Sequence, residues 1–195
     1  MVDEFSSFAR MPSAALEKAD LADAVRQAVF MESVRQPQID LSASVPAGPI
    51  HALFDTRLIA QALTNLIKNS VEAIEYDGVE SIEKPRIVVS ARQEGDHVRV
   101  AVTDNGKGWP AENRQRLLEP YMTTREKGTG LGLAIVAKII EQHGGIVELL
   151  DAEADDQGRV GASFEFTLPM WVARQHVPEG ERPASDFVEP STGDQ

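Results

Sequence analysis

Two groups of glycines within residues 104–132 constrain this chain more than any other feature of its sequence. The first group follows a carboxylate in Asp104-Asn105-Gly106-Lys107-Gly108, and the second opens an apolar segment in Gly128-Thr129-Gly130-Leu131-Gly132. Glycine lets a backbone approach a ligand closely and adopt positive φ without a Cβ clash. A helix that begins directly after the second group would direct free N–H groups and a positive dipole end toward an anion. The stretch therefore predicts a phosphate-binding site.

The surrounding sequence predicts strands joined mainly by turns, with a few long helices between them. Helical periodicity covers 21–35, 56–75 and 131–143, with a short helix at 112–118, and strand patterns cover 39–43, 50–54, 86–92, 97–103, 146–150 and 162–168. Asp20 and Asp55 are the predicted N-caps of the first two helices. We therefore expect an α+β two-layer sandwich, in which about three helices cover one face of a mostly antiparallel sheet of about five strands.

The spacing of apolar residues predicts which side of each helix is buried. The predicted stripes are Leu21, Val25, Ala28, Val29 and Val34 in the first helix, Ile59, Leu63, Ile67, Val71 and Ile74 in the second, and Leu131, Ile135 and Ile139 in the third. His143 ends the third helix, and we interpret it as a cation that favours the helix dipole.

Composition limits the partners that this domain can have. A net charge of −12 argues against a nucleic-acid partner, because such binding depends on cations that neutralise phosphates. The same charge means that local donors and a metal ion must hold any polyphosphate ligand. The chain has no cysteine, which excludes disulfides and thiolate metal sites and suits a reducing cytoplasm. Residues 173–195 are rich in acids and prolines and are predicted to be disordered.

A polar stripe runs along the helix predicted at 56–75, away from its apolar side. Asn65 and Asn69 lie one turn apart on this stripe, although Asn is a poor helix former. The carbonyl oxygen of Asn69 would suit Mg²⁺, and Asn65 would orient a water or a phosphate oxygen. Lys68 would reach a phosphate. The alternative is a solvated helix face with an ordinary surface lysine.

Asp104 is the candidate for base recognition. A carboxylate only accepts hydrogen bonds, so it would select an amine such as the exocyclic amine of adenine, and Gly106 and Gly108 would let the base lie against the backbone. A simple Asp-Asn-Gly turn is the alternative.

The loop between the two glycine groups carries hydroxyls and cations. Thr123, Thr124, Arg125 and Lys127 supply these donors, and Tyr121 would anchor the loop. We interpret the loop as a lid that closes over the phosphates. A polar surface loop is the alternative.

In this order, the four segments resemble the ATP-binding catalytic domain of sensor histidine kinases, a superfamily shared with gyrase and heat-shock-chaperone ATPases. Asn65-Leu66-Ile67-Lys68-Asn69 is similar to the N box, Asp104–Gly108 to the first glycine box, Glu119–Thr124 to the F box with Tyr121 for the usual Phe, and Gly128–Leu133 to the second glycine box. Arg125 and residues 127–145 are most similar to the nitrogen-regulation group of these kinases.

The resemblance implies ATP as ligand and Mg²⁺ as cofactor. Asp104 would read adenine, Asn69 would hold the metal, and Gly128, Gly130 and Gly132 would wrap the phosphates together with the lid. Two residues depart from the family pattern: Glu72 stands where a Lys is frequent, and Ala162 stands where many relatives have Thr.

None of the four histidines, His51, His97, His143 and His176, lies in a phosphoacceptor motif. The resemblance therefore implies transfer of the γ-phosphoryl group to a His on a separate dimerisation helix, of which residues 1–12 would be the end, with 13–172 as the catalytic domain. It further implies a response-regulator receiver domain as partner, a homodimeric full-length protein and the cytoplasmic portion of a membrane-anchored sensor.

Two other functions stay open. A self-contained ATPase of the same superfamily would hydrolyse ATP alone. However, Asn65 occupies the place of a Glu that activates water in those relatives, and an amide cannot act as a general base. A non-catalytic nucleotide-sensing module would bind ATP without transferring phosphate to any acceptor.

Overall fold

The computed structural model describes residues 12–76, 82, 84–123, 129–155 and 158–171. Its elements are β1 (Glu17–Asp20), α2 (Leu21–Arg35), β2 (Asp40–Ser44), β3 (His51–Phe54), α3 (Thr56–Tyr76), β4 (Arg86–Glu94), β5 (His97–Asp104), the 3₁₀ helix η2 (Arg114–Leu118), α4 (Gly132–Gln142), β6 (Val147–Asp151) and β7 (Ala162–Pro169). The predicted end of a dimerisation helix at 1–12 lies, apart from Pro12, outside the described residues, and so does the predicted disordered tail at 173–195.

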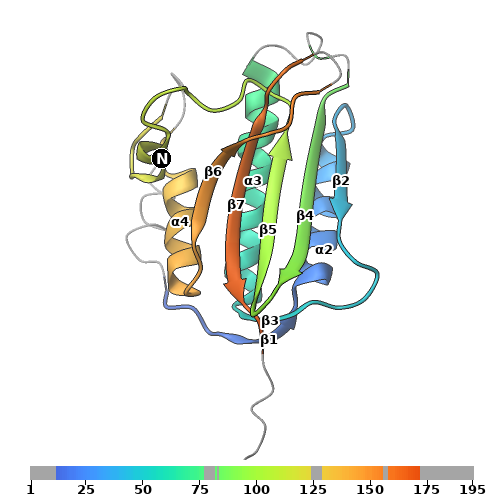
Figure 1. Cartoon of the computed structure of the whole chain (residues 1–195), viewed down its shortest axis with the longest axis vertical. Helices are drawn as coiled ribbons and strands as arrows, with labels where there is room; N and C mark the ends of the chain where they lie inside the picture. The colour runs from blue at the N-terminus through green and yellow to red at the C-terminus, as the bar shows by residue number, and fades with distance from the viewer. Residues whose placement is uncertain (1–11, 77–81, 83, 124–128, 156–157, 172–195) are drawn as a thin grey trace, which may run out of the picture.

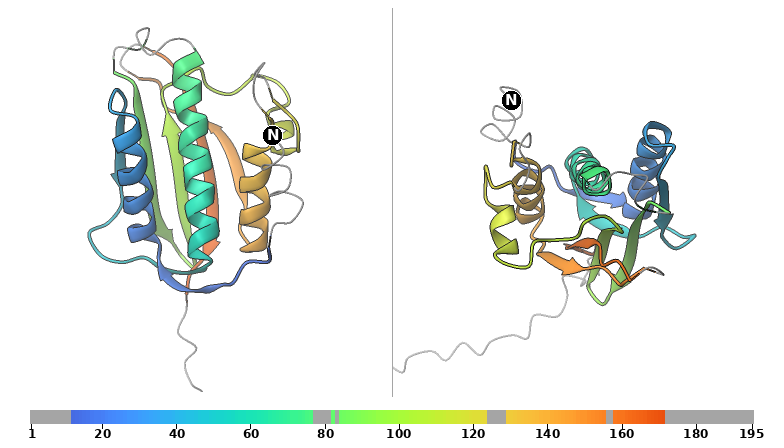
Figure 2. Two further views of the ribbon diagram at one scale, coloured as in Figure 1. Left: turned by 180° about the vertical axis from the view of Figure 1, so that it is seen from behind. Right: turned by 90° about the horizontal axis from the view of Figure 1, so that it is seen from above.

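The main sheet has five strands in the order β2-β4-β5-β7-β6. Only the β2–β4 pair is parallel, so the prediction of a mostly antiparallel sheet is confirmed. Helices α2, α3 and α4 lie side by side on one face of this sheet, with α3 in the middle (Figures 1 and 2). The two-layer α+β sandwich predicted from the sequence is therefore the observed architecture.

A second, two-stranded sheet forms at one end of the molecule, where β1 pairs antiparallel with β3 (Figure 1). The strand at 50–54 was expected, but neither β1 nor the separation of this pair from the main sheet was. The segment Glu17-Lys18-Ala19-Asp20 has no β-branched or aromatic residue, so only its tertiary partner makes it a strand.

Every residue of the apolar stripes that were predicted for the second and third helices is buried in the structure. In α2 the prediction is wrong for Val34, which is 69% exposed. With 100° per residue, Val34 lies about 220° around the helix from Leu21, whereas Glu32 lies only about 20° away. Glu32 therefore takes the buried position, and Arg35 holds its carboxylate at 2.7 Å.

Both predicted N-caps are present. The Asp20 carboxylate accepts the Ala22 N–H at 3.0 Å, and the Asp55 carboxylate accepts the Arg57 and Leu58 N–H groups at 3.0 and 3.1 Å. These bonds satisfy donors that the first turn of a helix leaves without intrahelical partners.

His143 lies at the end of α4, as expected, but it is not the predicted cation. The side chain is almost completely buried, and its Nε2 accepts the Asp55 backbone N–H at 2.9 Å. Its Nδ1 donates to the Ile139 carbonyl at 2.6 Å. An imidazole that accepts through one nitrogen and donates through the other is neutral.

Among the residues that the structure describes, no helix is both long enough and apolar enough to span a membrane.

Candidate functional site

A cavity of about 500 Å³ opens between α3, the loop after β5 and the start of α4. Its wall brings together residues from all of the predicted segments. The predicted site residues that line it are Asn65, Lys68, Asn69, Asp104, Gly108, Thr123, Thr129, Gly130 and Gly132. The predictions for Thr124, Arg125, Lys127 and Gly128 lie outside the described residues. Segments that are distant in the sequence thus form one site.

Asp104 ends β5 at the wall of this cavity and is 5% exposed. Its Oδ1 accepts the Gly106 N–H at 2.9 Å and the Ala162 N–H at 3.5 Å. The next residue, Asn105, accepts the Arg86 N–H and donates to the Lys84 carbonyl, both at 2.8 Å. The Asp-Asn-Gly turn is therefore real, and the same turn holds a buried carboxylate at the cavity wall.

The two glycines of the first group have different structural roles. A Cβ on Gly106 would come within 2.7 Å of the Ala73 backbone, so the absence of a side chain lets the loop pack directly on α3. Gly106 does not line the cavity, whereas Gly108 does. Gly108 has a φ of +70°, and its Cβ would come within 2.8 Å of the Val160 carbonyl.

Gly161 packs against the Asp104 turn without lining the cavity, a role that was not predicted. A Cβ there would lie 1.8 Å from the Asp104 carbonyl oxygen, which means that the start of β7 can approach the Asp104 turn only without a side chain. The signal in the sequence is a glycine directly before the strand that begins at Ala162.

The polar stripe of α3 forms part of the cavity wall, with Asn65, Asn69 and Glu72 partly buried and Lys68 exposed. The start of α4 lies opposite, since a Cβ on Gly132 would be 3.5 Å from Asn69 Nδ2 and 3.7 Å from its Oδ1. An amide oxygen in a cavity wall beside glycine backbone fits a Mg²⁺ ion, which takes few protein ligands and is completed by phosphate oxygens and water.

The ends of the predicted lid meet at Tyr121 and Gly130. The Tyr121 N–H donates to the Gly130 carbonyl at 3.0 Å, and both residues adopt a φ of +67°. A Cβ on Gly130 would come within 2.5 Å of the Tyr121 backbone. The Tyr121 side chain is 59% exposed and does not line the cavity, and the Leu131 side chain lies in the core. These residues therefore contribute through their backbones.

Several aromatic residues also line the cavity and were not predicted. Trp109 donates from Nε1 to the Leu150 carbonyl at 2.9 Å, which ties the first glycine loop to β6. The Lys107 Nζ lies 3.8 Å from the centre of the Tyr76 ring, a cation–π contact between the loop and the end of α3. Trp109 directly follows the first glycine group, and the Tyr76 ring contacts Lys107 of that group. The type of a side chain does not show in which direction it points, so neither residue was predicted to line the cavity.

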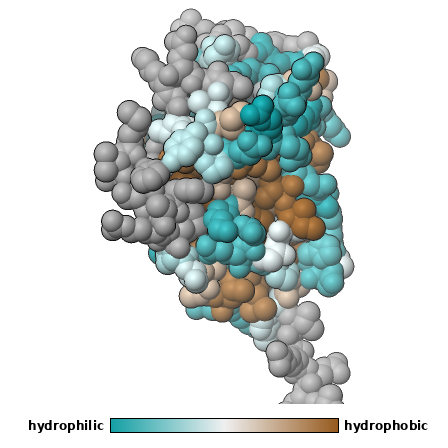
Figure 3. Space-filling view, turned by 90° about the vertical axis from the view of Figure 1, so that its left-hand side faces the viewer, coloured by the Kyte–Doolittle hydropathy of each residue, from teal (hydrophilic) through white to brown (hydrophobic). Residues whose placement is uncertain are grey.

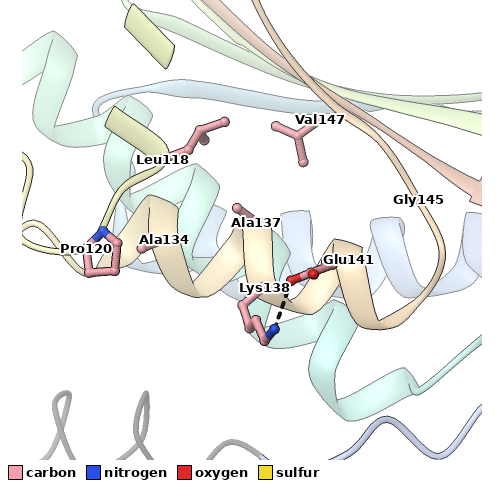
Figure 4. Close-up of a pocket in the computed structure, with 8 residues that line it drawn as sticks. All are labelled: Leu118, Pro120, Ala134, Ala137, Lys138, Glu141, Gly145 and Val147. Atoms are coloured by element: carbon pink, nitrogen blue, oxygen red, sulfur yellow. Dashed lines mark hydrogen bonds and ion pairs between the residues drawn. The ribbon is translucent and has the colours of Figure 1, made fainter. Parts of the chain in front are cut away.

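A second cavity, of about 410 Å³, lies on the outer side of α4 (Figure 4). It is lined by Leu118, Pro120, Ala134, Ala137, Lys138, Glu141, Gly145 and Val147. Lys138 and Glu141 form an ion pair of 2.9 Å at its edge, and the other side chains are apolar. Apolar surface is visible on this flank of the molecule (Figure 3). Among the described residues that line this groove, acids and amides do not converge, so this lining does not suit a nucleotide.

The comparisons with known proteins bear on the larger cavity. A family described as histidine kinase-, DNA gyrase B- and HSP90-like ATPase matches residues 54–172, which is more than half of the chain. The chain belongs to this ATPase family. Residues 54–172 contain every described residue that lines the cavity, so the family match and the geometry identify the same site.

Curated relatives of this ATPase-family chain include two named kinase groups. The chain is 51% identical over 168 residues to nitrogen regulation protein NtrY of Azorhizobium caulinodans, covering 86% of this chain and 21% of that protein. It is 33% identical over 184 residues to sensor histidine kinase ZraS of Escherichia coli K12, covering 92% of this chain and 36% of that protein. The chain thus spans about a fifth to a third of these relatives.

Solved structures of histidine kinases share the fold. Full-length ShkA in complex with AMPPNP matches with a TM-score of 0.72 and 27% identity, over 88% of this chain and 35% of that one. The catalytic domain of histidine kinase ThkA matches with a TM-score of 0.65 and 29% identity, over 80% of this chain and 95% of that one. The resemblance derived from the four sequence segments is confirmed at the level of family and fold.

Proposed function

We propose that this chain binds Mg-ATP and acts as the catalytic domain of a sensor histidine kinase. One observation carries the proposal: a single cavity joins the buried Asp104 carboxylate, the asparagines of α3 and the glycine backbone at the start of α4. That arrangement provides a selective acceptor at one end and amide and backbone donors at the other. The AMPPNP complex of the structurally similar ShkA supports an adenine nucleotide as the ligand.

The base would occupy the Asp104 end of the cavity. Asp104 is oriented by the Gly106 N–H, and apolar side chains of Val102 and Phe164 line the same region. A carboxylate would accept from the exocyclic amine of adenine, whereas the carbonyl of guanine at that position offers no donor. This end of the cavity therefore favours ATP over GTP.

The phosphates would occupy the end formed by Asn65, Lys68, Asn69 and Gly132. Asn69 would hold Mg²⁺ through its amide oxygen, and the metal would offset the negative charge of the transferred group. Lys68 would contribute a local cation in a chain whose net charge is −12. The N-terminus of α4 adds N–H groups that favour an anion.

The reaction would be phosphoryl transfer to a histidine. A neutral imidazole nitrogen of the acceptor attacks the γ-phosphorus, the bond from that phosphorus to the bridging oxygen breaks, and ADP leaves with both electrons of that bond. Asn65 lines the cavity but cannot remove a proton from water, so it would position a phosphate oxygen and not activate hydrolysis. This supports kinase chemistry over a self-contained ATPase.

The acceptor would be a dimerisation helix elsewhere in a longer protein, and a receiver domain would take the phosphate next. The relatives named as sensor histidine kinases support this assignment, as does the absence of a phosphoacceptor motif around the four histidines. We place the domain in the cytoplasm, where ATP is available, within a homodimeric sensor. NtrY similarity favours a role in nitrogen regulation.

The decisive experiment mixes this chain with γ-labelled ATP, Mg²⁺ and a fragment that carries the acceptor helices of NtrY. Acid-labile, base-stable label on that fragment is the expected result, since phosphohistidine has this stability. Multiple turnovers of ATP without the fragment would support the ATPase alternative. ATP binding without label on any acceptor would support the nucleotide-sensing alternative.

The metal assignment has its own test in Asn69→Ala. We expect this variant to weaken ATP binding in Mg²⁺ far more than ATP binding in a chelator, because only the former uses the amide oxygen as a ligand. Isothermal titration calorimetry in the two buffers measures both affinities. Equal weakening in the two buffers would contradict the metal role.

A further inference from the structure

The nucleotide cavity contains a second carboxylate, Glu72, to which neither base recognition nor metal binding assigns a role. Glu72 lies on α3 and lines the cavity together with Asn69 and Ala73. It is partly buried, in contrast to the neighbouring Glu75, which is exposed and does not line the cavity.

Contacts across the cavity show which residues of α3 lie beside each of its two ends. At one end, Gly106 packs on the Ala73 backbone, and the Lys107 N–H donates to the Ala73 carbonyl at 3.4 Å. The Asp104 turn is therefore level with residue 73. At the other end, Gly132 at the start of α4 lies against the Asn69 side chain. The phosphate end is thus level with residue 69.

Glu72 lies about 4.5 Å along the helix axis from Asn69, at 1.5 Å per residue, and so between the two ends. In any nucleoside triphosphate the sugar connects the base to the phosphates. A nucleotide with its base at Asp104 and its phosphates at Asn69 would therefore present its ribose to Glu72.

The chemistry of a carboxylate fits the sugar better than it fits the phosphates. An ionised carboxylate only accepts hydrogen bonds, and the ribose 2′- and 3′-hydroxyls are donors. A bond from a hydroxyl to a carboxylate is charge-assisted and stronger than a neutral one. The phosphates, in contrast, would repel the same carboxylate. Lys68 lies one turn away from Glu72, toward the phosphate end.

We propose that Glu72 accepts a hydrogen bond from a ribose hydroxyl and makes the site selective for ribonucleotides over deoxyribonucleotides. This inference rests on the proposed ATP site. It assigns to one residue a property that adenine recognition and metal binding do not provide, namely discrimination between sugars.

The test compares the affinities of ATP, 2′-dATP and 3′-dATP for the wild-type chain, Glu72→Ala and Glu72→Gln, in Mg²⁺ and in a chelator. In the wild type, we expect at least one deoxy analogue to bind about tenfold more weakly than ATP. Glu72→Ala should weaken ATP binding by the same factor and leave the affinity for that analogue unchanged. The ratio of the two affinities should then approach one. Glu72→Gln, which retains a neutral acceptor, should restore part of the discrimination.

Glu75→Ala is the matched control, because it removes a glutamate from the same helix outside the cavity, and it should retain the wild-type ratio. An unchanged ratio in Glu72→Ala would overturn the inference. The inference would also be overturned if Glu72→Ala weakened the binding of all three nucleotides equally and removed the dependence of binding on Mg²⁺. That result would make Glu72 a metal ligand. If the wild type bound none of the three, the proposed ATP site itself would fail, and this inference with it.

Discussion

Asp104 illustrates how one residue can serve the fold and the site together. The turn and the base-reading acid were competing interpretations of Asp104-Asn105-Gly106, yet the structure contains a turn that orients a buried carboxylate. The bond from the Gly106 N–H to Oδ1 sets the side-chain rotamer. A carboxylate held in this way would lose little further side-chain entropy on binding a ligand.

Asp104→Asn tests this role at the scale of a single functional group. The substitution keeps the shape and an oxygen that can accept the Gly106 N–H, but it replaces the other oxygen by a donor. We expect adenine-nucleotide affinity to fall by roughly 1–3 kcal/mol, measured by calorimetry. An unfolding curve like that of the wild type would show that the turn is intact. Unchanged ATP affinity would remove the adenine assignment.

At the scale of elements, α3 holds the site together, because the Asp104 turn and the start of α4 contact it and the end of α4 contacts the residue directly before it. The turn contacts it through Gly106 at Ala73, and the start of α4 through Gly132 at Asn69. The end of α4 reaches the first residue before α3 through His143 and Asp55. The distances between the groups that line the cavity therefore depend on how these segments pack around one helix.

Gly106→Ala is expected to disturb this packing. The new Cβ would meet helix backbone at 2.7–2.9 Å, which cannot move aside as a flexible side chain could. We expect a loss of about 1–3 kcal/mol in the free energy of unfolding, measured with urea. Gly48→Ala is the matched control, because nothing lies within 4 Å of a Cβ there. Equal stability of the two variants would contradict the close-packing role of Gly106.

The link between the end of α4 and the start of α3 is tested by His143→Phe. Phenylalanine retains a ring but has no acceptor for the buried Asp55 N–H, and leaving such a donor unsatisfied costs about 1–3 kcal/mol. Thermal or urea denaturation measures the loss. His97→Phe, at the exposed start of β5, should change stability little, since the contact between His97 and Asp96 is exposed to solvent. Similar effects of the two substitutions would argue against the buried hydrogen bond.

For the whole molecule, Asp55 joins three parts of the chain and makes its stability depend on pH. Burial raises the pKa of this carboxyl, but hydrogen bonds from the Ala15, Leu58 and Arg57 N–H groups and the charge of Arg57 together lower its pKa below the usual 3.8. A lowered folded-state pKa means that the ionised form stabilises the fold. This stabilisation is complete above the unfolded-state pKa and is lost as the pH falls below about 3.8.

Asp55→Asn should therefore be less stable than the wild type at pH 7, and this difference should shrink as the pH falls below 4. Urea unfolding of both proteins between pH 7 and pH 3 measures the difference. Asp40→Asn, at the exposed start of β2, is the control for general charge effects. A difference that stayed constant across this range would show that the Asp55 charge does not contribute.

Local patterns determined most of the elements and the order of the site segments. Helical stripes, the Asp20 and Asp55 caps and alternating strands depend on neighbours a few residues apart, so their physics is visible in the sequence. The glycine groups likewise reflect local requirements of the backbone, namely positive φ and close approach. These signals were sufficient for the α+β sandwich, for the bounds of the three long helices and for the ATPase-family resemblance, whereas the short helix predicted at 112–118 is the 3₁₀ helix Arg114–Leu118.

Tertiary structure alone decided the features that depend on a distant partner. Strand β1 exists because β3 pairs with it, Glu32 is buried because α2 turns it toward the core, and His143 is neutral because the Asp55 N–H reaches its Nε2. Gly161 packs on the Asp104 turn, and Trp109 is held at the cavity wall, only because β7 and β6 lie beside that turn. Such contacts join residues far apart in the sequence, and no periodic or local pattern encodes them.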